Sequence, residues 1–236
     1  MVAMWLLALA AADPVAIPAG EAHLGESIQP DNPPRQESLE AFSIDRTEVS
    51  VDAFEAFAFE GYERPELWSE AGRAWLEENP QGAGAAHRAA GRSGEHPVVA
   101  VTFYEAEAYC ASQGGRLPTE WEWERAACGG LDQTWPWGDE SSVDAEWYDL
   151  GKTGHIDAVS TAGVASQQPA LRSPEGLHHM AGNVWEWTAS DYDDAGNWSV
   201  LRGGSYMNLP SYCHCSHREP ARPERVAYTA GFRCAY

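Results

Sequence analysis

Basic residues are scarce in this chain. It has 15 Lys and Arg against 36 Asp and Glu, which gives a formal net charge of −21 at pH 7 over 236 residues. Such a charge repels nucleic-acid phosphates and anionic membrane surfaces, so we expect no nucleic-acid partner. Cations and basic peptides match it better, although an acidic surface that only keeps the protein soluble has the same composition.

Long hydrophobic runs are also missing. The apolar stretch Val2–Ala12 is too short to cross a bilayer, so we expect no transmembrane segment. It ends in an Ala-x-Ala pattern before Asp13, as the hydrophobic part of a signal peptide does, but lacks the positively charged start. Residues 1–12 are therefore predicted to be a signal-like segment of an exported protein, periplasmic or extracellular. An ordinary buried segment is the alternative.

Several catalytic motifs are absent as well. There is no P-loop, no Gly-x-Gly-x-x-Gly after a strand and no Gly-x-Ser-x-Gly elbow. Nucleotide chemistry and serine hydrolysis are therefore not expected. The length of 236 residues and the 44% apolar content fit one sizeable domain, which we expect over residues 13–236.

Short helices and strands are predicted between many loops. Two capping boxes, Thr102 to Glu105 and Thr119 to Glu122, mark the starts of two helices that end near Gly114 and Gly129. Ser50 is a candidate N-cap. The remaining predicted elements are a strand, turn and second strand over 15–25, strands over 42–49 and 96–101, and helices over 51–59 and 65–79. Eleven Trp, nine Tyr and six Phe suit loops that are pinned by large side chains.

Five segments together resemble the formylglycine-generating enzyme family, also called sulfatase-modifying factors. They are the turn Arg116–Glu120, Trp135–Glu140, Gly182–Trp187, Arg202–Cys215 and Gly231–Cys234. The resemblance runs from about Val15 to Tyr236. It implies an α+β domain elaborated from the C-type-lectin fold, with low regular secondary structure.

The same resemblance points to a reactive site in the Arg202–Cys215 segment. Family oxidases use two cysteines, thought to bind copper, to convert a sulfatase cysteine in a Cys-x-Pro-x-Arg context to formylglycine. Here Cys213 matches the second cysteine, whereas Asn208 stands in place of the first. The positions that line the family's pocket are kept as Ser205, Tyr212 and Trp185, for which packing is the alternative role.

A second soft ligand for copper is available only locally. In an extended segment Cys213, Cys215 and His217 would point to one side, so Cys213 and Cys215 are candidate copper ligands with His217 beside them. This spacing is tighter than that of ordinary structural zinc sites.

The five cysteines leave at least one thiol unpaired within the monomer. By resemblance, Cys110 and Cys234 form a disulfide. Cys128 matches another bridging cysteine, but its partner position is Arg218. Cys128 is therefore either free or bonded to Cys213 or Cys215.

A calcium site is implied in the Gly182–Trp187 loop. The family's ligands correspond to the side chains of Glu186 and His179 and the carbonyls of Gly182 and Val184. His179 brings no side-chain oxygen, the donor that calcium prefers, and a structural carboxylate is the alternative role of Glu186. A second calcium site would involve Asp157 or its neighbours.

Two functions follow from these features. The first is an exported binding protein that has lost or altered the oxidase reaction and recognises a peptide, a sugar or a protein, with a sulfatase among the candidates. The second is a copper-dependent oxidase with Cys213 as the essential ligand. The break at Asn208 favours the first. The oligomeric state is not indicated.

Overall fold

The computed structural model describes residues 13–83, 94–139, 161–165 and 169–236, so the signal-like segment and Asp157 lie outside it.

Two small antiparallel sheets form at the N-terminal end of the chain. β1 (Pro14–Ile17) pairs with β4 (Phe42–Asp45), and β2 (Gly20–Leu24) pairs with β3 (Arg35–Leu39). The two strands predicted over 15–25 are thus present, but each joins a different sheet.

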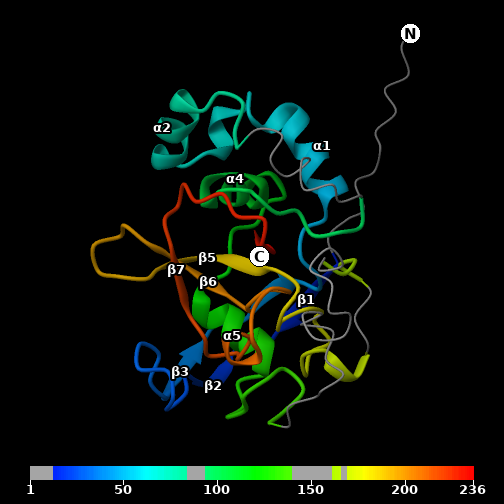
Figure 1. Cartoon of the computed structure of the whole chain (residues 1–236), viewed down its shortest axis with the longest axis vertical. Coiled ribbons are helices and arrows are strands. Elements are labelled where there is room, and N and C mark those ends of the chain that lie inside the picture. The colour runs from blue at the N-terminus through cyan, green and yellow to red at the C-terminus, as the bar shows by residue number, and fades with distance from the viewer. Residues whose placement is uncertain (1–12, 84–93, 140–160, 166–168) are drawn as a thin grey trace.

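A four-stranded sheet crosses the middle of the molecule (Figure 1). Its order is β7 (Glu219–Ala221), β6 (Ser199–Arg202), β5 (Trp185–Asp191) and β8 (Ala230–Gly231). β5 pairs antiparallel with β6 and parallel with β8. Residues 203–218, here called the Cys213 loop, connect β6 to β7, so this sheet supports the candidate site.

The helices lie on the two sides of this sheet (Figure 1). α1 (Val51–Gly61), α2 (Glu70–Glu78) and α4 (Phe103–Ser112) lie on one side, and α5 (Glu120–Cys128) lies on the other. Ser50 caps α1, and capping boxes open α4 and α5, as predicted. Gly129 ends α5 in the left-handed region with φ 68°.

Each side has its own hydrophobic cluster. The cluster on the α1 and α4 side includes Phe54, Tyr109 and Phe232, and the cluster on the α5 side includes Trp123 and Met180. The aromatic side chains predicted to anchor the loops therefore fill the core on both sides of the sheet.

Three predicted elements differ from the structure, and the first is the strand predicted over 42–49, which ends at Asp45. The helix predicted over 65–79 is a 3-10 turn (Pro65–Leu67) followed by α2, because Trp68 is extended and the Ser69 side chain caps a new helix. The strand predicted over 96–101 makes a single bridge, between Ser50 and Pro97. There the amides of Val98 and Ala100 bond to separate segments, and Ala100 has φ 58°, so no continuous ladder forms.

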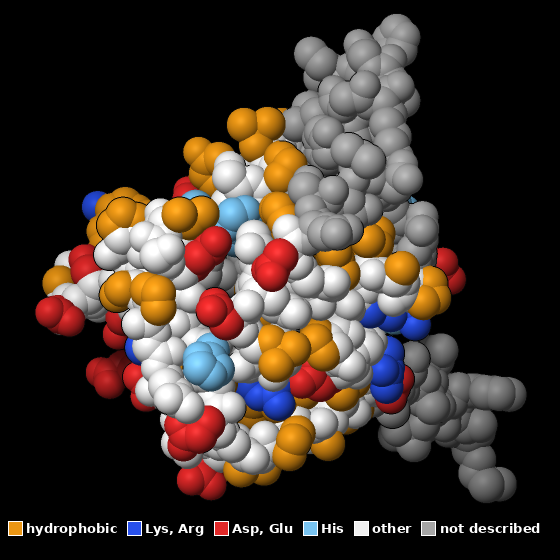
Figure 2. Space-filling view, turned by 90° about the horizontal axis from the view of Figure 1, so that it is seen from below, with side chains coloured by type: hydrophobic (Ala, Val, Ile, Leu, Met, Phe, Trp, Pro, Cys, Tyr) orange, Lys and Arg blue, Asp and Glu red, His pale blue; other side chains and the backbone are white. Residues whose placement is uncertain are grey.

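The described residues have an α+β architecture in which loops outnumber regular elements, as expected. None of their helices has the length and apolarity needed to span a bilayer. Acidic side chains are spread over the face in Figure 2 among hydrophobic and arginine side chains, consistent with the net charge.

Candidate functional site

The Cys213 loop begins where β6 ends. Gly203 and Gly204 follow Arg202 with φ of 92° and 73°. A Cβ on Gly204 would lie 2.4 Å from the Cys213 sulfur, so only glycine lets the backbone pass this close. The loop then makes a 3-10 turn at Pro210–Tyr212. Cys213 follows this turn and packs against Gly204.

Asn208, which occupies the position of the family's first cysteine, turns back onto its own loop. Its Oδ1 accepts hydrogen bonds from the Ser205 hydroxyl at 2.5 Å and from the Ser205 amide at 3.1 Å. The Asn208 backbone amide donates to the Ser205 carbonyl oxygen at 2.9 Å. Asn208 and Ser205 therefore stabilise a local turn, and the Asn208 side chain supplies no soft donor for a metal.

Cys213 is unpaired and has no exposed surface. Burial raises the pKa of its thiol to about 12, and backbone hydrogen bonds from Gly182 and Ser205 oppose this only in part. The thiol is therefore neutral at physiological pH, whereas nucleophiles and metal ligands need the thiolate.

The candidate copper ligand Cys215 is not available, because it forms a disulfide with Cys128. This corrects the prediction that Cys213 and Cys215 converge on one ion with His217. Within the described residues no group of three or more His, Cys, Asp or Glu side chains is placed to hold a metal. A single buried thiol does not fit a copper site made of two thiolates.

The other predicted disulfide, between Cys110 and Cys234, is present with a Cα–Cα distance of 5.5 Å. It ties α4 to the last residues of the chain. Of the alternatives left open for Cys128, the bond to Cys215 is the one observed.

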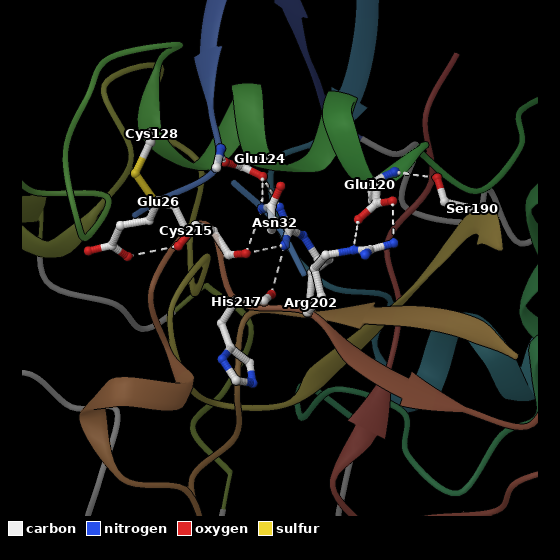
Figure 3. A network of polar contacts seen from close by, with 12 residues as sticks. Glu26, Asn32, Glu120, Glu124, Cys128, Ser190, Arg202, Cys215 and His217 are labelled. Atoms are coloured by element: carbon white, nitrogen blue, oxygen red, sulfur yellow. Dashed lines mark hydrogen bonds and ion pairs between the residues drawn. A yellow bond between two sulfur atoms is a disulfide. The ribbon is translucent and has the colours of Figure 1, made fainter. Parts of the chain in front are cut away.

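Arg218 stands at the position where the family places the partner of Cys128, and it makes an ion pair instead. Its guanidinium donates to both carboxylate oxygens of Glu120 at 2.6 and 3.0 Å. Figure 3 shows Glu120 on the same helix as Glu124, the ion-pair partner of Arg202, and as Cys128 of the Cys128–Cys215 disulfide. The crosslink is thus moved by three residues along the loop, and the vacated position is filled by charge pairing with α5.

Trp185, Tyr212 and His217 form an aromatic group next to the loop. The His217 ring lies 5.8 Å from the Trp185 ring and 5.0 Å from the Tyr212 ring, between centroids. Burial and the nearby Arg202 lower the pKa of His217 to about 4, so its ring is neutral at physiological pH. The structure therefore brings two of the predicted pocket residues together around a histidine.

The tip of the loop presents apolar side chains to solvent. Met207, Leu209 and Tyr212 are 55%, 61% and 41% exposed. Large exposed side chains on a pinned loop are typical of a contact surface.

The predicted calcium ligands have other partners. Glu186 is fully buried, and its carboxylate accepts from Arg233 at 2.7 and 2.8 Å and from the Trp123 indole at 2.7 Å. The His179 ring contacts the Gly163 carbonyl at 3.2 Å, and burial lowers its pKa to about 3. The only anionic ligand of the set is already neutralised by a guanidinium, so these contacts fit the structural alternative for Glu186 better than a calcium ligand. Calcium binding by this loop, including the Gly182 and Val184 carbonyls, stays a prediction.

Two supporting residues had no signal in the sequence. Asn183, with φ 59°, donates to the buried Glu48 carboxylate at 2.8 Å, and its carbonyl accepts from the Tyr206 amide at 2.9 Å. Glu48 and Asn183 thus hold the 182–187 segment against the Cys213 loop. Their pairing spans 135 residues, which no local pattern reveals.

A known domain family matches nearly the whole chain. The model of the sulfatase-modifying factor enzyme 1-like domain matches residues 8–236. This chain belongs to the formylglycine-generating enzyme family. The formylglycine-generating enzyme of Bos taurus is 31% identical over 280 residues, covering 94% of this chain and 74% of that protein.

The relatives of this chain include one protein named as an enzyme and another named as inactive. A Mus musculus protein named inactive C-alpha-formylglycine-generating enzyme 2 is 32% identical over 245 residues, covering 87% of this chain and 78% of that protein. Treponema denticola variable protein 1 has a solved structure with a TM-score of 0.69 at 22% identity, covering 94% of each chain. That likeness shows the fold alone. Family membership therefore leaves the activity to be argued from the site.

Proposed function

We propose that this chain is an exported binding protein of the formylglycine-generating enzyme family that has lost the oxidase reaction. The observation that carries the proposal is the state of Cys213, which is buried, neutral and without a second thiol beside it. Asn208 is committed to Ser205, and Cys215 is committed to Cys128. A copper ion would therefore find one protonated sulfur in place of two thiolates.

The ligand in this proposal is a peptide or protein segment. The loop tip with Met207, Leu209 and Tyr212 supplies apolar contact area, and the acidic chain favours basic partners. Sulfatases remain candidates, because a segment around the Cys-x-Pro-x-Arg cysteine contains an arginine. Recognition would then proceed without oxidation.

Export is part of the proposal. Two disulfides are typical of oxidising compartments, and the signal-like residues 1–12 agree with export. Mass spectrometry of the protein secreted by its host tests this, because cleavage after Ala12 would leave Asp13 at the N-terminus. An intact N-terminus on a cytoplasmic protein would contradict it.

The alternative is a copper-dependent oxidase that converts a peptide cysteine to formylglycine. One observation favours it: Cys213 is the cysteine that the two disulfides leave unpaired. Incubating the protein with Cu(I), oxygen, a reductant and a Cys-x-Pro-x-Arg peptide separates the two functions. We expect the peptide to be bound but to keep its mass. A peptide mass lower by about 18 Da is expected when a cysteine becomes formylglycine, because sulfur is exchanged for oxygen and two hydrogens are lost. This result would establish the oxidase alternative.

A further inference from the structure

A cavity of about 350 Å³ lies away from the Cys213 loop. Its walls come from the segment between β4 and α1, from α1 and α4, and from residues 164–165 and 178. None of Ser205, Asn208, Tyr212, Cys213 and Trp185 lines it. It is therefore a second site, separate from the one that the family resemblance indicates.

Two buried polar side chains in its lining have an atom without a hydrogen-bond partner. Glu48 is 2% exposed and His178 is 5% exposed. Glu48 Oε1 accepts from Asn183, but Glu48 Oε2 and His178 Nδ1 have no partner among the described residues. Buried polar atoms in native proteins are nearly always paired with protein, water or ligand, so these two point to a molecule bound in the cavity.

The charges of the lining favour a cation. Arg46 is paired with Asp13 at 2.6 Å, which leaves the carboxyl groups of Asp45 and Glu48 without a basic partner in the lining. The nearby Arg233 is committed to Glu186 at 2.7 Å. Desolvation raises the pKa of both carboxyls, and the charge of Arg233 opposes this only in part.

Part of the remaining lining is suited to a short alkyl group. Val49, Ala53, Val164 and Ala165 contribute apolar side chains, next to the polar residues Thr47, Ser50 and Gln113. A ligand with an ammonium at one end and a few methylenes at the other would satisfy both parts.

We propose that this cavity binds a small primary amine, whose ammonium group donates hydrogen bonds to Glu48 and His178 while its alkyl chain packs on Ala53. His178 accepts through Nδ1 in the tautomer that carries its proton on Nε2. This inference goes beyond the proposed function, because none of the predicted pocket residues of the Cys213 site lines this cavity.

Titration of the full chain with propylammonium chloride tests the proposal. We expect a saturable rise in the melting temperature, because a ligand that binds only the folded state stabilises it. Sodium propionate and sodium chloride at equal ionic strength should give no saturable rise. One bound amine per chain is expected by calorimetry.

Two variants locate the binding. Ala53→Leu, which fills the cavity from a helix position, and Glu48→Gln should each weaken binding at least tenfold. The matched control Glu55→Gln, exposed on the same helix, should leave it unchanged. If Glu48→Gln does not fold, Ala53→Leu decides. A response to propylammonium no larger than to sodium chloride, or unchanged binding in Ala53→Leu, would overturn the proposal and leave a cavity filled by water.

Discussion

The Ser205 hydroxyl donates a hydrogen bond to Asn208 Oδ1 at 2.5 Å, across the turn where family oxidases carry their first cysteine. Asn208 thus stabilises the turn of its own loop. The turn leaves Cys213 without a soft partner, and this pairing is the structural basis of the proposed loss of activity.

Replacing Asn208 measures how much its hydrogen bonds to Ser205 stabilise the folded protein. Asn208→Ala removes the acceptor of two hydrogen bonds from Ser205, so we expect the free energy of unfolding to fall by about 1 to 2 kcal/mol. Chemical denaturation measures this. Ser205→Ala keeps the hydrogen bond from the Ser205 backbone amide to Asn208 but loses the hydroxyl bonds to Asn208 and Met207, so it should cost a similar amount.

The variant Asn208→Cys restores the spacing of two cysteines five residues apart. We expect it to retain Cu(I) where the wild type does not, because two thiolates can then bind the ion. Competition with a Cu(I) chelator measures the retention, and Asn208→Ser is the matched control of similar size. Equal retention by both variants would show that the loop cannot bring the two sulfurs together.

Cys213 should be unreactive in the folded protein. With two disulfides among five cysteines, we expect one thiol per chain in denaturant and almost none under native conditions at pH 8. The folded pKa of about 12 lies above the ordinary value of 9, so this group lowers the stability of the folded state as pH rises from about 9 to 12. Cys213→Ala should reduce that loss. Rapid labelling of the native wild type at pH 8 would contradict the buried thiol.

The Cys128–Cys215 disulfide should stabilise the loop strongly. It closes 87 residues, and the double variant Cys128→Ala with Cys215→Ala should lower the free energy of unfolding by about 2 to 5 kcal/mol. Thermal and chemical denaturation of the oxidised proteins measure the change. A loss well below 1 kcal/mol would mean that the Arg218–Glu120 pair already holds this segment.

Glu48 should make stability depend on pH. Burial raises the pKa of its carboxyl from 4.5 to about 8, so the folded state holds the proton more tightly than the unfolded chain does. The contribution of this group therefore becomes less favourable as pH rises from about 4.5 to 8. Glu48→Gln keeps an acceptor for Asn183 and cannot ionise, so its stability should fall less over that range. Glu55→Gln, an exposed control on α1, should follow the wild type.

Local patterns predicted the helices best, because their causes are local. The capping boxes at Thr102 and Thr119 and the cap at Ser50 each act over three residues, and all three form as expected. The strand expected over 96–101 was wrong, because its amides bond to distant segments that the local sequence does not specify.

The site could be predicted only in part. Family resemblance implied the Cys110–Cys234 disulfide, which is present, while the role of Cys213, Trp185 and Tyr212 as site residues stays a prediction. The sequence left Cys128 either free or bonded to Cys213 or Cys215, and the bond to Cys215 depends on the position of α5. The Arg218–Glu120 pair joins residues 98 positions apart and depends on the same packing.

Chelation tests the calcium prediction. If the 179–186 loop holds calcium, as the family resemblance predicts, a chelator in excess should lower the melting temperature of the purified protein and added calcium should restore it. An unchanged melting temperature would contradict the prediction and leave Glu186 as the structural partner of Arg233.

A Cu(I) titration of the wild-type protein, with chelator competition and the Asn208→Cys variant in parallel, tests the central claim most directly. We expect no stoichiometric high-affinity site in the wild type, because Cys213 is its single buried thiol. One tightly bound Cu(I) per chain that disappears in Cys213→Ala would contradict the loss of the oxidase site.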